Sequence, residues 1–417
     1  MKIKKLLAAA FFCAAILCAM SVTGFAEDII VDSGNGQQTT YTDLATAVEA
    51  APDGSTVTVP AGEYTLESKT YNSSINGSLT YGLKFDKSIT LKGAQAGISA
   101  LDRTGEETVL KSSVNGYNSG MILFTRYGVD VTIDGFTFES ESWDTIGNDD
   151  PGVQKVNIVN NIFQTNGQNT TPVKLKLEQG AISNNKFIGE NCGYGVRINP
   201  IDTRDTSWTS EEMPDEFNID IAIESNDFSG ITLTDTMRGV IDLNTGETTG
   251  AIKVANNDFS GINATSIVNK CKNVTVESEN NYFNVENAAE LQAAIDAASE
   301  GDTINLASGT YDISAAGISI NKPIILKGVE GTEIIGSICI QSGDVTIDGL
   351  KFTSPVKIGG EEEPVCIFIN TVVAPATSYD NITITNCDFT PTNKYTSDKG
   401  SKYKGIVTSS AGSYDKL

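Results

Sequence analysis

Short runs of alternating apolar and polar residues recur along the chain, and many of them end in one four-residue motif. The motif has Asn second and Phe fourth, and it occurs as Asn160-Asn161-Ile162-Phe163, Asn184-Asn185-Lys186-Phe187, Ser225-Asn226-Asp227-Phe228, Asn256-Asn257-Asp258-Phe259 and Asn280-Asn281-Tyr282-Phe283. Where no insertion intervenes, it returns after 24 residues. This period, built from short β-branched strands, predicts an all-β solenoid in which each rung covers its neighbour.

The recurring Asn and Phe have a structural explanation. Asn tolerates left-handed backbone and hydrogen-bonds to the chain nearby, so it suits a turn at a fixed place in each rung. Buried amides on successive rungs can satisfy one another, and we expect the Phe to point inward and stack on its counterparts. The alternative is an exposed aromatic row that binds sugars, but spacing tied to a turn motif is typical of a core.

The chain also contains a duplication. The Ala-rich stretches Leu44 to Ala51 and Ala288 to Ala298 have helical spacing of their apolar residues. The matched segments are Leu44–Gly54 with Leu291–Gly301, Ile89–Gly93 with Ile324–Gly328, and Val131–Gly135 with Val345–Gly349. We therefore predict two tandem units, residues 27–284 and a shorter 285–417, each preceded by a short capping helix.

Residues 1–26 have the features of a secretory signal peptide. Lys2, Lys4 and Lys5 give a basic start, the run from Leu6 to Met20 is small and apolar, and Ala26 closes a small-residue cleavage site. We expect a bacterial protein that is secreted or held at the cell surface. No later apolar run approaches the length of a bilayer span, so none is expected after signal removal.

Composition narrows the chemistry further. The 417 residues include no His, which rules out Ser-His-Asp and Cys-His nucleophiles and His-ligated zinc. The net charge is -24, and loss of the three Lys of the signal peptide lowers it to -27. A nucleic-acid partner is excluded, because phosphate binding needs clustered Lys and Arg.

Five cysteines remain after signal removal. They are Cys192, Cys271, Cys339, Cys366 and Cys387. An odd number at wide spacing predicts buried free thiols rather than a disulfide framework. The alternative is a disulfide, for example between two of the last three, which fall in successive strand-like segments.

The repeats resemble those of right-handed parallel β-helix proteins of the pectate-lyase-like superfamily, over nearly the whole mature chain. The opening, Ile30 to Gly36 and then Val57 to Tyr64, is similar to the start of pectin methylesterases. The resemblance implies an all-β, right-handed parallel β-helix. It does not imply one activity, because many β-helix families share such starts.

The catalytic motifs of these families do not carry over. Glu139-Ser140 stands where pectin methylesterases have Gln-Asp, and the Gly-His-Gly of polygalacturonases needs a His. The Arg-x-Pro-x-x-Arg of pectate lyases is most similar to the segment from Arg197 to Arg204, in which both spacings are one residue too long.

That segment nevertheless has the residue types for β-elimination from an acidic polysaccharide. Arg197 and Arg204 are candidate catalytic bases, provided that their pKa is strongly lowered, and Asp202 and Asp205 are candidate Ca²⁺ ligands. The candidate sugar-binding side chains are Trp143, Tyr194 and Trp208. The competing interpretation, a solvated loop of mixed charge, is favoured because the motif spacing fails.

Other acidic groups are weaker candidates. Asp149-Asp150 lies in a loop predicted from Trp143 to Pro151, where a turn is favoured over a pair of glycosidase carboxylates because adjacent side chains point apart. Solvated loop tips, with loose calcium binding as the alternative, are expected for Glu211-Glu212, Asp215-Glu216 and Glu361-Glu362-Glu363.

Three functions stay open. The first is a non-catalytic surface or adhesion module that binds a glycan or another partner. The second is a polysaccharide lyase or hydrolase acting on an acidic polysaccharide such as pectin, and the third is a structural stalk. We favour the first, since it explains both the duplication and the missing motifs. An acidic solenoid also repels polyuronates unless calcium or the few Arg intervene.

Overall fold

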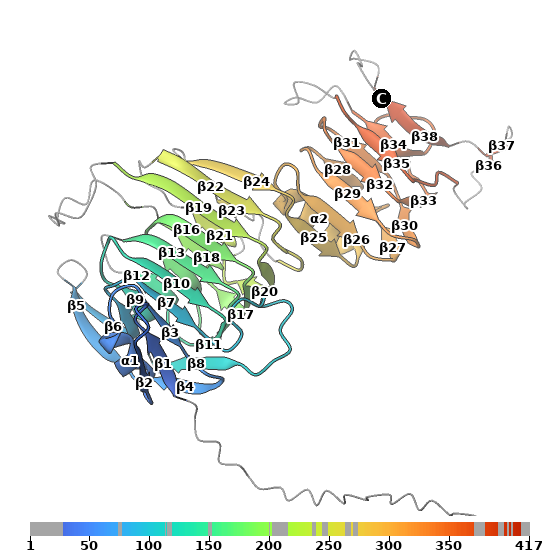
Figure 1. Ribbon diagram of the computed structural model, residues 1–417. Coiled ribbons are helices and arrows are strands. Elements are labelled where there is room, and N and C mark those ends of the chain that lie inside the picture. Colours follow the sequence, from blue (N-terminus) through green and yellow to red (C-terminus); the bar gives the residue numbers. More distant parts are fainter. Residues whose placement is uncertain are drawn as a thin grey trace, which may run out of the picture.

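The computed structural model describes residues 28–73, 77–112, 114, 119–148, 152–199, 201, 216–235, 239–243, 249–262, 268–269, 274–370, 380–390, 396–397, 400–401 and 403–409. The predicted signal peptide lies outside them. The described chain is nearly all β-structure, with helices α1 (Leu44–Ala50) and α2 (Ala288–Ala297), and most strands stack in parallel (Figure 1). This arrangement confirms the predicted solenoid of parallel sheets. Its handedness and its division into two units stay predictions.

Three sheets, named A, B and C here, build the first copy of the duplication, residues 27–284. Sheet A holds β1 (Ile29–Asp32), β2 (Gln38–Tyr41), β3 (Ser55–Thr58), β7 (Ile89–Lys92), β10 (Asp130–Asp134), β13 (Val153–Val159), β16 (Leu177–Ser183), β19 (Asn218–Glu224), β22 (Thr249–Ala255) and β24 (Thr275–Glu279). Sheet B holds β4 (Gly62–Leu66), β8 (Thr108–Ser112), β11 (Phe136–Ser140), β14 (Ile162–Thr165), β17 (Lys186–Cys192) and β20 (Asp227–Leu233). Sheet C holds β5 (Lys69–Ser73), β6 (Gly77–Phe85), β9 (Ser119–Phe124), β12 (Asp144–Asn148), β15 (Thr171–Leu175), β18 (Val196–Ile198), β21 (Ile241–Leu243) and β23 (Val268–Asn269).

Three further sheets, D, E and F, hold the strands of the second copy, residues 285–417, and β25 at the end of the first. Sheet D holds β25 (Tyr282–Val285), β26 (Thr303–Leu306), β29 (Ile325–Gly328), β32 (Thr346–Asp348) and β35 (Thr383–Thr385). Sheet E holds β27 (Gly309–Asp312), β30 (Thr332–Ile335) and β33 (Lys351–Ser354). Sheet F holds β28 (Ile318–Ile320), β31 (Ile338–Ile340), β34 (Val365–Ile369) and β38 (Lys404–Thr408), while β36 (Thr396–Ser397) and β37 (Gly400–Ser401) form a separate antiparallel pair.

The four-residue motif forms the corner between sheets A and B, as predicted. Its first residue has left-handed backbone, with φ of 56° at both Asn160 and Asn184. Its Asn is buried, and in the first four motifs it hydrogen-bonds to the Asn of the next rung, as Nδ2 of Asn185 does to Oδ1 of Asn226 at 3.0 Å. The Phe side chains stack inside, with centroids 5.0 Å apart for Phe163 and Phe187. The motif is therefore a core feature and not an exposed sugar-binding row.

Both predicted helices are present and capped. The side chain of Asp43 accepts from the backbone N–H of Thr46 at the start of α1, and Asn287 accepts from Ala289 and Glu290 at the start of α2. Each helix buries an apolar side, with Leu291 of α2 among the buried residues. These contacts satisfy the first N–H groups of each helix and hold it to the solenoid.

The cysteines in the described residues are free thiols. Cys192, Cys339 and Cys366 are buried, and Cys387 is partly buried. Burial raises the pKa of the Cys366 thiol, which keeps it protonated. The prediction of free thiols is thus confirmed for these four, and Cys271 lies outside the described residues.

Candidate functional site

One register row on the outward side of sheet C collects charged side chains. It passes through Lys84 on β6, Lys174 on β15, Arg197 on β18 and Asp242 on β21. In each of these strands the neighbouring residues are buried, so the charged ones face away from the core. With strands ~4.8 Å apart, the row follows the solenoid axis for roughly 24 Å.

Each cation of the row is paired with a carboxylate. Nζ of Lys84 lies 2.8 Å from Oδ2 of Asp86. Nζ of Lys174 lies 3.1 Å from Oδ2 of Asp144, and Nε of Arg197 lies 3.0 Å from Oδ2 of Asp242. The row is therefore rich in hydrogen-bonding groups but close to neutral.

Gly147 lies beside the central pair. It occupies the row between Leu123 and Lys174, and a Cβ at Gly147 would lie 3.4 Å from Cβ of Asp144. That distance is an ordinary van der Waals contact, and the carboxylate of Asp144 reaches Nζ of Lys174. Burial raises the pKa of Asp144, while the charges of Lys174 and Arg197 act in the opposite direction.

Aromatic rings accompany the cations. Cζ of Arg197 lies 5.0 Å from the ring centroid of Tyr194, and Nζ of Lys84 lies 5.9 Å from that of Tyr71. Both distances fit cation–π contacts. Trp143, which is partly buried, directly precedes β12 two rungs away from Tyr194. Of the three predicted sugar-binding aromatics, the structure thus places Trp143 and Tyr194 at sheet C.

Unpaired polar atoms also gather here. In the described part of the chain, six buried side-chain N or O atoms have no hydrogen-bond partner. Three of them, Oγ1 of Thr145, Nε of Arg197 and Oδ1 of Asn199, belong to β12, to β18 and to the residue just after β18. The Arg197–Asp242 pair is accordingly an ion pair without hydrogen-bond geometry. Buried polar atoms without a hydrogen-bond partner are uncommon in proteins, so their concentration at sheet C makes this sheet a candidate functional site.

The insertion that follows β18 starts and ends beside this face. Ile201 and Phe217 pack with Tyr127, whose hydroxyl donates to Oε2 of Glu178 at 2.5 Å. The insertion contains Arg204, Asp202, Asp205, Trp208 and Glu211-Glu212, all outside the described residues. Asp149-Asp150, which follow β12, also lie outside them. Their predicted roles as base, Ca²⁺ ligands and sugar platform stay predictions.

Two further expectations meet the structure directly. Asp144 to Asn148 form strand β12 and not the predicted loop, because they continue the register of sheet C. Glu361 lies at a turn, where its carboxylate accepts from Nζ of Lys404. Nowhere in the described ranges do three or more acidic or Cys side chains cluster as a metal site does.

Comparisons with known proteins locate no site. No family and no curated protein matches the chain. Among solved structures, a PL6 family alginate lyase, AlyGC, has 9% identity and a TM-score of 0.21 over 82% of this chain and 74% of that one. The A-module of mannuronan C-5 epimerase AlgE6 from Azotobacter vinelandii has 12% identity and a TM-score of 0.23 over 88% and 94%. The catalytic domain of a GH87 alpha-1,3-glucanase in complex with nigerose has 13% identity and a TM-score of 0.20 over 86% of this chain and 64% of that one.

Neither helix in the described ranges has the length and apolar character needed to cross a bilayer. Sequence reasoning singled out Arg197, Tyr194 and Trp143, which the structure brings to one sheet. It missed Lys174, Asp144 and Asp242. Lys174 and Asp242 had one signal, a charged residue between two apolar residues in a short strand, and Asp144, which stands between Trp143 and Thr145, lacked even that.

Proposed function

We propose that the protein is a secreted or cell-surface module, a right-handed β-helix of two tandem units, that binds a linear glycan along sheet C. The row from Lys84 to Asp242 carries this proposal, because its charged side chains and two cation–tyrosine contacts follow the solenoid axis. A linear polymer along that axis meets charged groups at three successive rungs, those of Lys174, Arg197 and Asp242, about 4.8 Å apart. Lys84 lies three rungs before Lys174, with Leu123 and Gly147 in the row between them.

An uncharged glycan suits the row better than a polyuronate. Lys and Arg have several N–H donors each, so a paired cation keeps donors for sugar hydroxyls. A uronate, in contrast, competes with Asp86, Asp144 and Asp242 for the cations. The net charge of -24 adds general repulsion of a polyanion.

A glycan array with the mature chain, followed by titration of the glycans that bind, tests the proposal. Arg197→Ala and Lys174→Ala are each expected to weaken binding about tenfold, as for lost hydrogen bonds to charged groups. Lys253→Ala is the control, since Lys253 pairs with Glu224 and Glu279 on sheet A at 3.0 and 3.1 Å. Equal weakening by Lys253→Ala, or full binding by all three variants, contradicts the proposal.

Cleavage of an acidic polysaccharide is the second candidate, favoured by one observation. Asp144 is a carboxyl with a raised pKa beside Lys174, so a group that can hold a proton lies next to a cation that can neutralise a uronate. Ultraviolet absorbance of unsaturated products and release of new reducing ends from uronate polymers, with and without Ca²⁺, test it, because β-elimination gives both signals and hydrolysis gives only the second. Product that disappears with Asp144→Asn supports cleavage, and absence of product from the wild type rejects it.

A further inference from the structure

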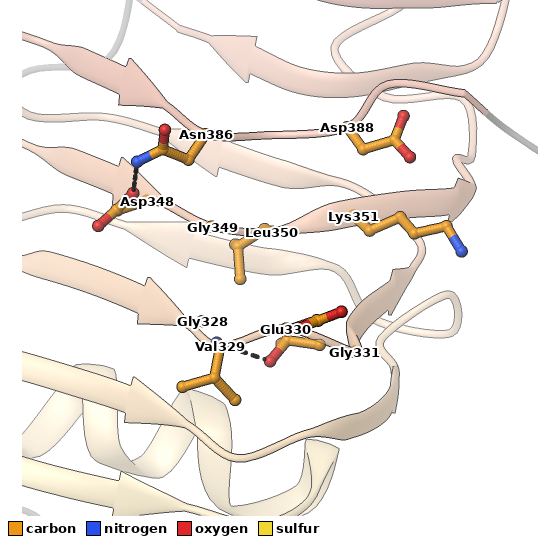
Figure 2. Close-up of a pocket in the computed structure, with 11 residues that line it drawn as sticks. Gly328, Val329, Glu330, Gly331, Asp348, Gly349, Leu350, Lys351, Asn386 and Asp388 are labelled. Carbon is orange, nitrogen blue, oxygen red and sulfur yellow. Dashed lines mark hydrogen bonds between the residues drawn. The ribbon is translucent and has the colours of Figure 1, made fainter.

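The second copy has an open groove at a place that the first copy fills. The groove has a volume of about 360 Å³ (Figure 2). Its lining residues are Gly328, Val329, Glu330, Gly331, Thr332, Asp348, Gly349, Leu350, Lys351, Asn386 and Asp388. It lies at the corner between sheets D and E, away from sheet C.

The two copies match residue by residue around this corner. Lys92 on β7 is the register neighbour of Asp134 on β10 in the first copy, and Lys327 on β29 is the register neighbour of Asp348 on β32 in the second. Nδ2 of Asn160 donates to Oδ1 of Asp134 at 2.7 Å, and Nδ2 of Asn386 donates to Oδ1 of Asp348 at 2.7 Å. The frame that surrounds the groove is therefore the same in both.

Glycines give both corners the same close backbone approach. A Cβ at Gly93 would lie 2.4 Å from the carbonyl oxygen of Gly135. A Cβ at Gly328 would lie 2.7 Å from that of Gly349. The two corners differ instead in the chain that follows the first glycine: residues 94–107 connect it to β8 in the first copy, and residues 329–331 connect it to β30 in the second.

In the first copy, the long connection places an arginine in the corner. The side chain of Arg103 is only 3% exposed. Its Nη2 donates to the carbonyl of Asn160, and its Nη1 lies 3.4 Å from the carbonyl oxygen of Phe136. The same connection donates the backbone N–H of Gly97 to Asp134 at 3.0 Å.

In the second copy, residues at the same positions line the groove. The positions of Asn160, Phe136 and Asp134 are taken by Asn386, Leu350 and Asp348, all of which line it. Among the lining residues the cation is Lys351, and its Nζ lies 2.5 Å from Oε1 of Glu333. The groove thus keeps the residue positions whose carbonyl groups contact the guanidinium in the first copy, whereas Glu107, which lies 2.5 Å from Nη1 of Arg103, belongs to the longer connection and has no counterpart in the second copy.

We propose that this groove binds an arginine side chain carried on a loop of a partner polypeptide, in the place that Arg103 takes in the first copy. An arginine suits it because the planar guanidinium donates to two carbonyl groups at once, which the ammonium of lysine does not match. A polypeptide suits it because the first copy supplies both the guanidinium and a backbone N–H from one loop. Glu330, Asp348 and Asp388 add negative charge that favours a cation.

Titration of the full mature chain with a capped peptide of residues 94–107 tests this site, which is independent of the glycan proposal. We expect saturable binding, and a loss of about tenfold with Asp348→Asn, because this variant removes a charge near the guanidinium but keeps an oxygen acceptor for Asn386. Replacing the peptide's Arg103 with Lys is expected to weaken binding similarly.

Asp344→Asn is the matched control. Oδ1 of Asp344 accepts from Nδ2 of Asn381 at 2.9 Å on the same sheet, but Asp344 does not line the groove. Thermal unfolding verifies that both variants fold. Absence of peptide binding, equal binding by Asp348→Asn, or equal weakening by Asp344→Asn overturns the proposal.

Discussion

The buried Asn of the motif satisfies two backbone groups of the preceding rung. Asn226 accepts from the backbone N–H of Asn185 at 3.0 Å and donates from Nδ2 to the carbonyl of Ile182 at 2.8 Å. Because these groups are buried, they have no access to water in place of the amide. The recurrence of Asn at this position therefore follows from hydrogen bonding within the core.

Truncation of one such amide is expected to be costly. Asn226→Ala leaves a buried N–H and a buried carbonyl without this partner, which lowers the free energy of unfolding by about 3 kcal/mol. Chemical denaturation measures the loss. The control is Asn157→Ala, because Asn157 is partly buried and bonds to Oγ1 of Thr132 at 3.3 Å on the outer side of sheet A. Equal losses for the two variants contradict this role of the motif Asn.

The hydrogen-bonded series of motif Asn side chains, from Asn161 to Asn281, ends at an acidic residue, Asp302. We call this series the ladder. Nδ2 of Asn281 donates to Oδ1 of Asp302 at 3.2 Å, and the backbone N–H of Ser299 donates to Oδ2 at 2.7 Å. Asp302 is 1% exposed. Burial raises the pKa of Asp302 from 3.8 to about 6, although these hydrogen bonds act to lower it.

This shift predicts a pH dependence of stability. Between about pH 4 and pH 6 the folded chain keeps a proton that the unfolded chain has released, so the free energy of unfolding falls as the pH rises, by about 3 kcal/mol in total. Asp302→Asn cannot ionise and should lack this part of the slope, whereas the exposed Asp53→Asn should keep it. Denaturation curves from pH 4 to pH 7 measure the difference, and parallel curves for the wild type and Asp302→Asn contradict it.

At the scale of elements, the connection 94–107 depends on Arg103. The guanidinium joins it to the motif turn at Asn160 and lies 2.5 Å from Oε2 of Glu107. Burial lowers the pKa of Arg103, and the negative charge of Glu107 partly offsets that effect. A buried cation of this kind is expensive to remove because its acceptors lose their partner.

Arg103→Ala is therefore expected to loosen the connection. Limited proteolysis should cut within residues 94–107 faster than in the wild type, and the free energy of unfolding should fall by about 3 kcal/mol. Lys111→Ala serves as control, because Lys111 forms a half-exposed pair with Glu63 at 2.9 Å, and solvent-exposed pairs contribute little to stability. An unchanged cleavage pattern in Arg103→Ala rejects the role assigned to the guanidinium.

Much at this scale could be predicted from sequence, because each signal was local. The turn Asn, the inward Phe and the capping helices follow from residues within one rung. Strand β12 was predicted as part of a loop, since the sequence Asn-Asp-Asp-Pro-Gly that starts at Asn148 suggests a turn, and only its pairing with β9 and β15 makes it a strand. The pair Lys174–Asp144 likewise depends on register across rungs, which periodicity alone does not give.

At the scale of the whole molecule, equivalent strands of the two copies have different neighbours. Strand β3 of the first copy lies in sheet A, but its counterpart β26 pairs with β25. Single-residue bridges at Asp258 connect β25 to sheet B, so sheet D continues sheet B and not sheet A. Figure 1 shows α2 and β25 at this junction, beside β24. Asp302 in the second copy occupies the position of Ser55 in the first, and it accepts a hydrogen bond from Asn281, the last Asn of the ladder.

The central claim is that sheet C holds a glycan along the solenoid axis. A crystal structure of the mature chain with a linear oligosaccharide found by the array tests it most directly. The account predicts sugar rings along the row from Lys84 to Asp242, with hydroxyls bonded to Lys174 and Arg197 and a ring near Trp143. A sugar bound on sheet A or B, or in the groove of the second copy, with sheet C empty, would contradict it.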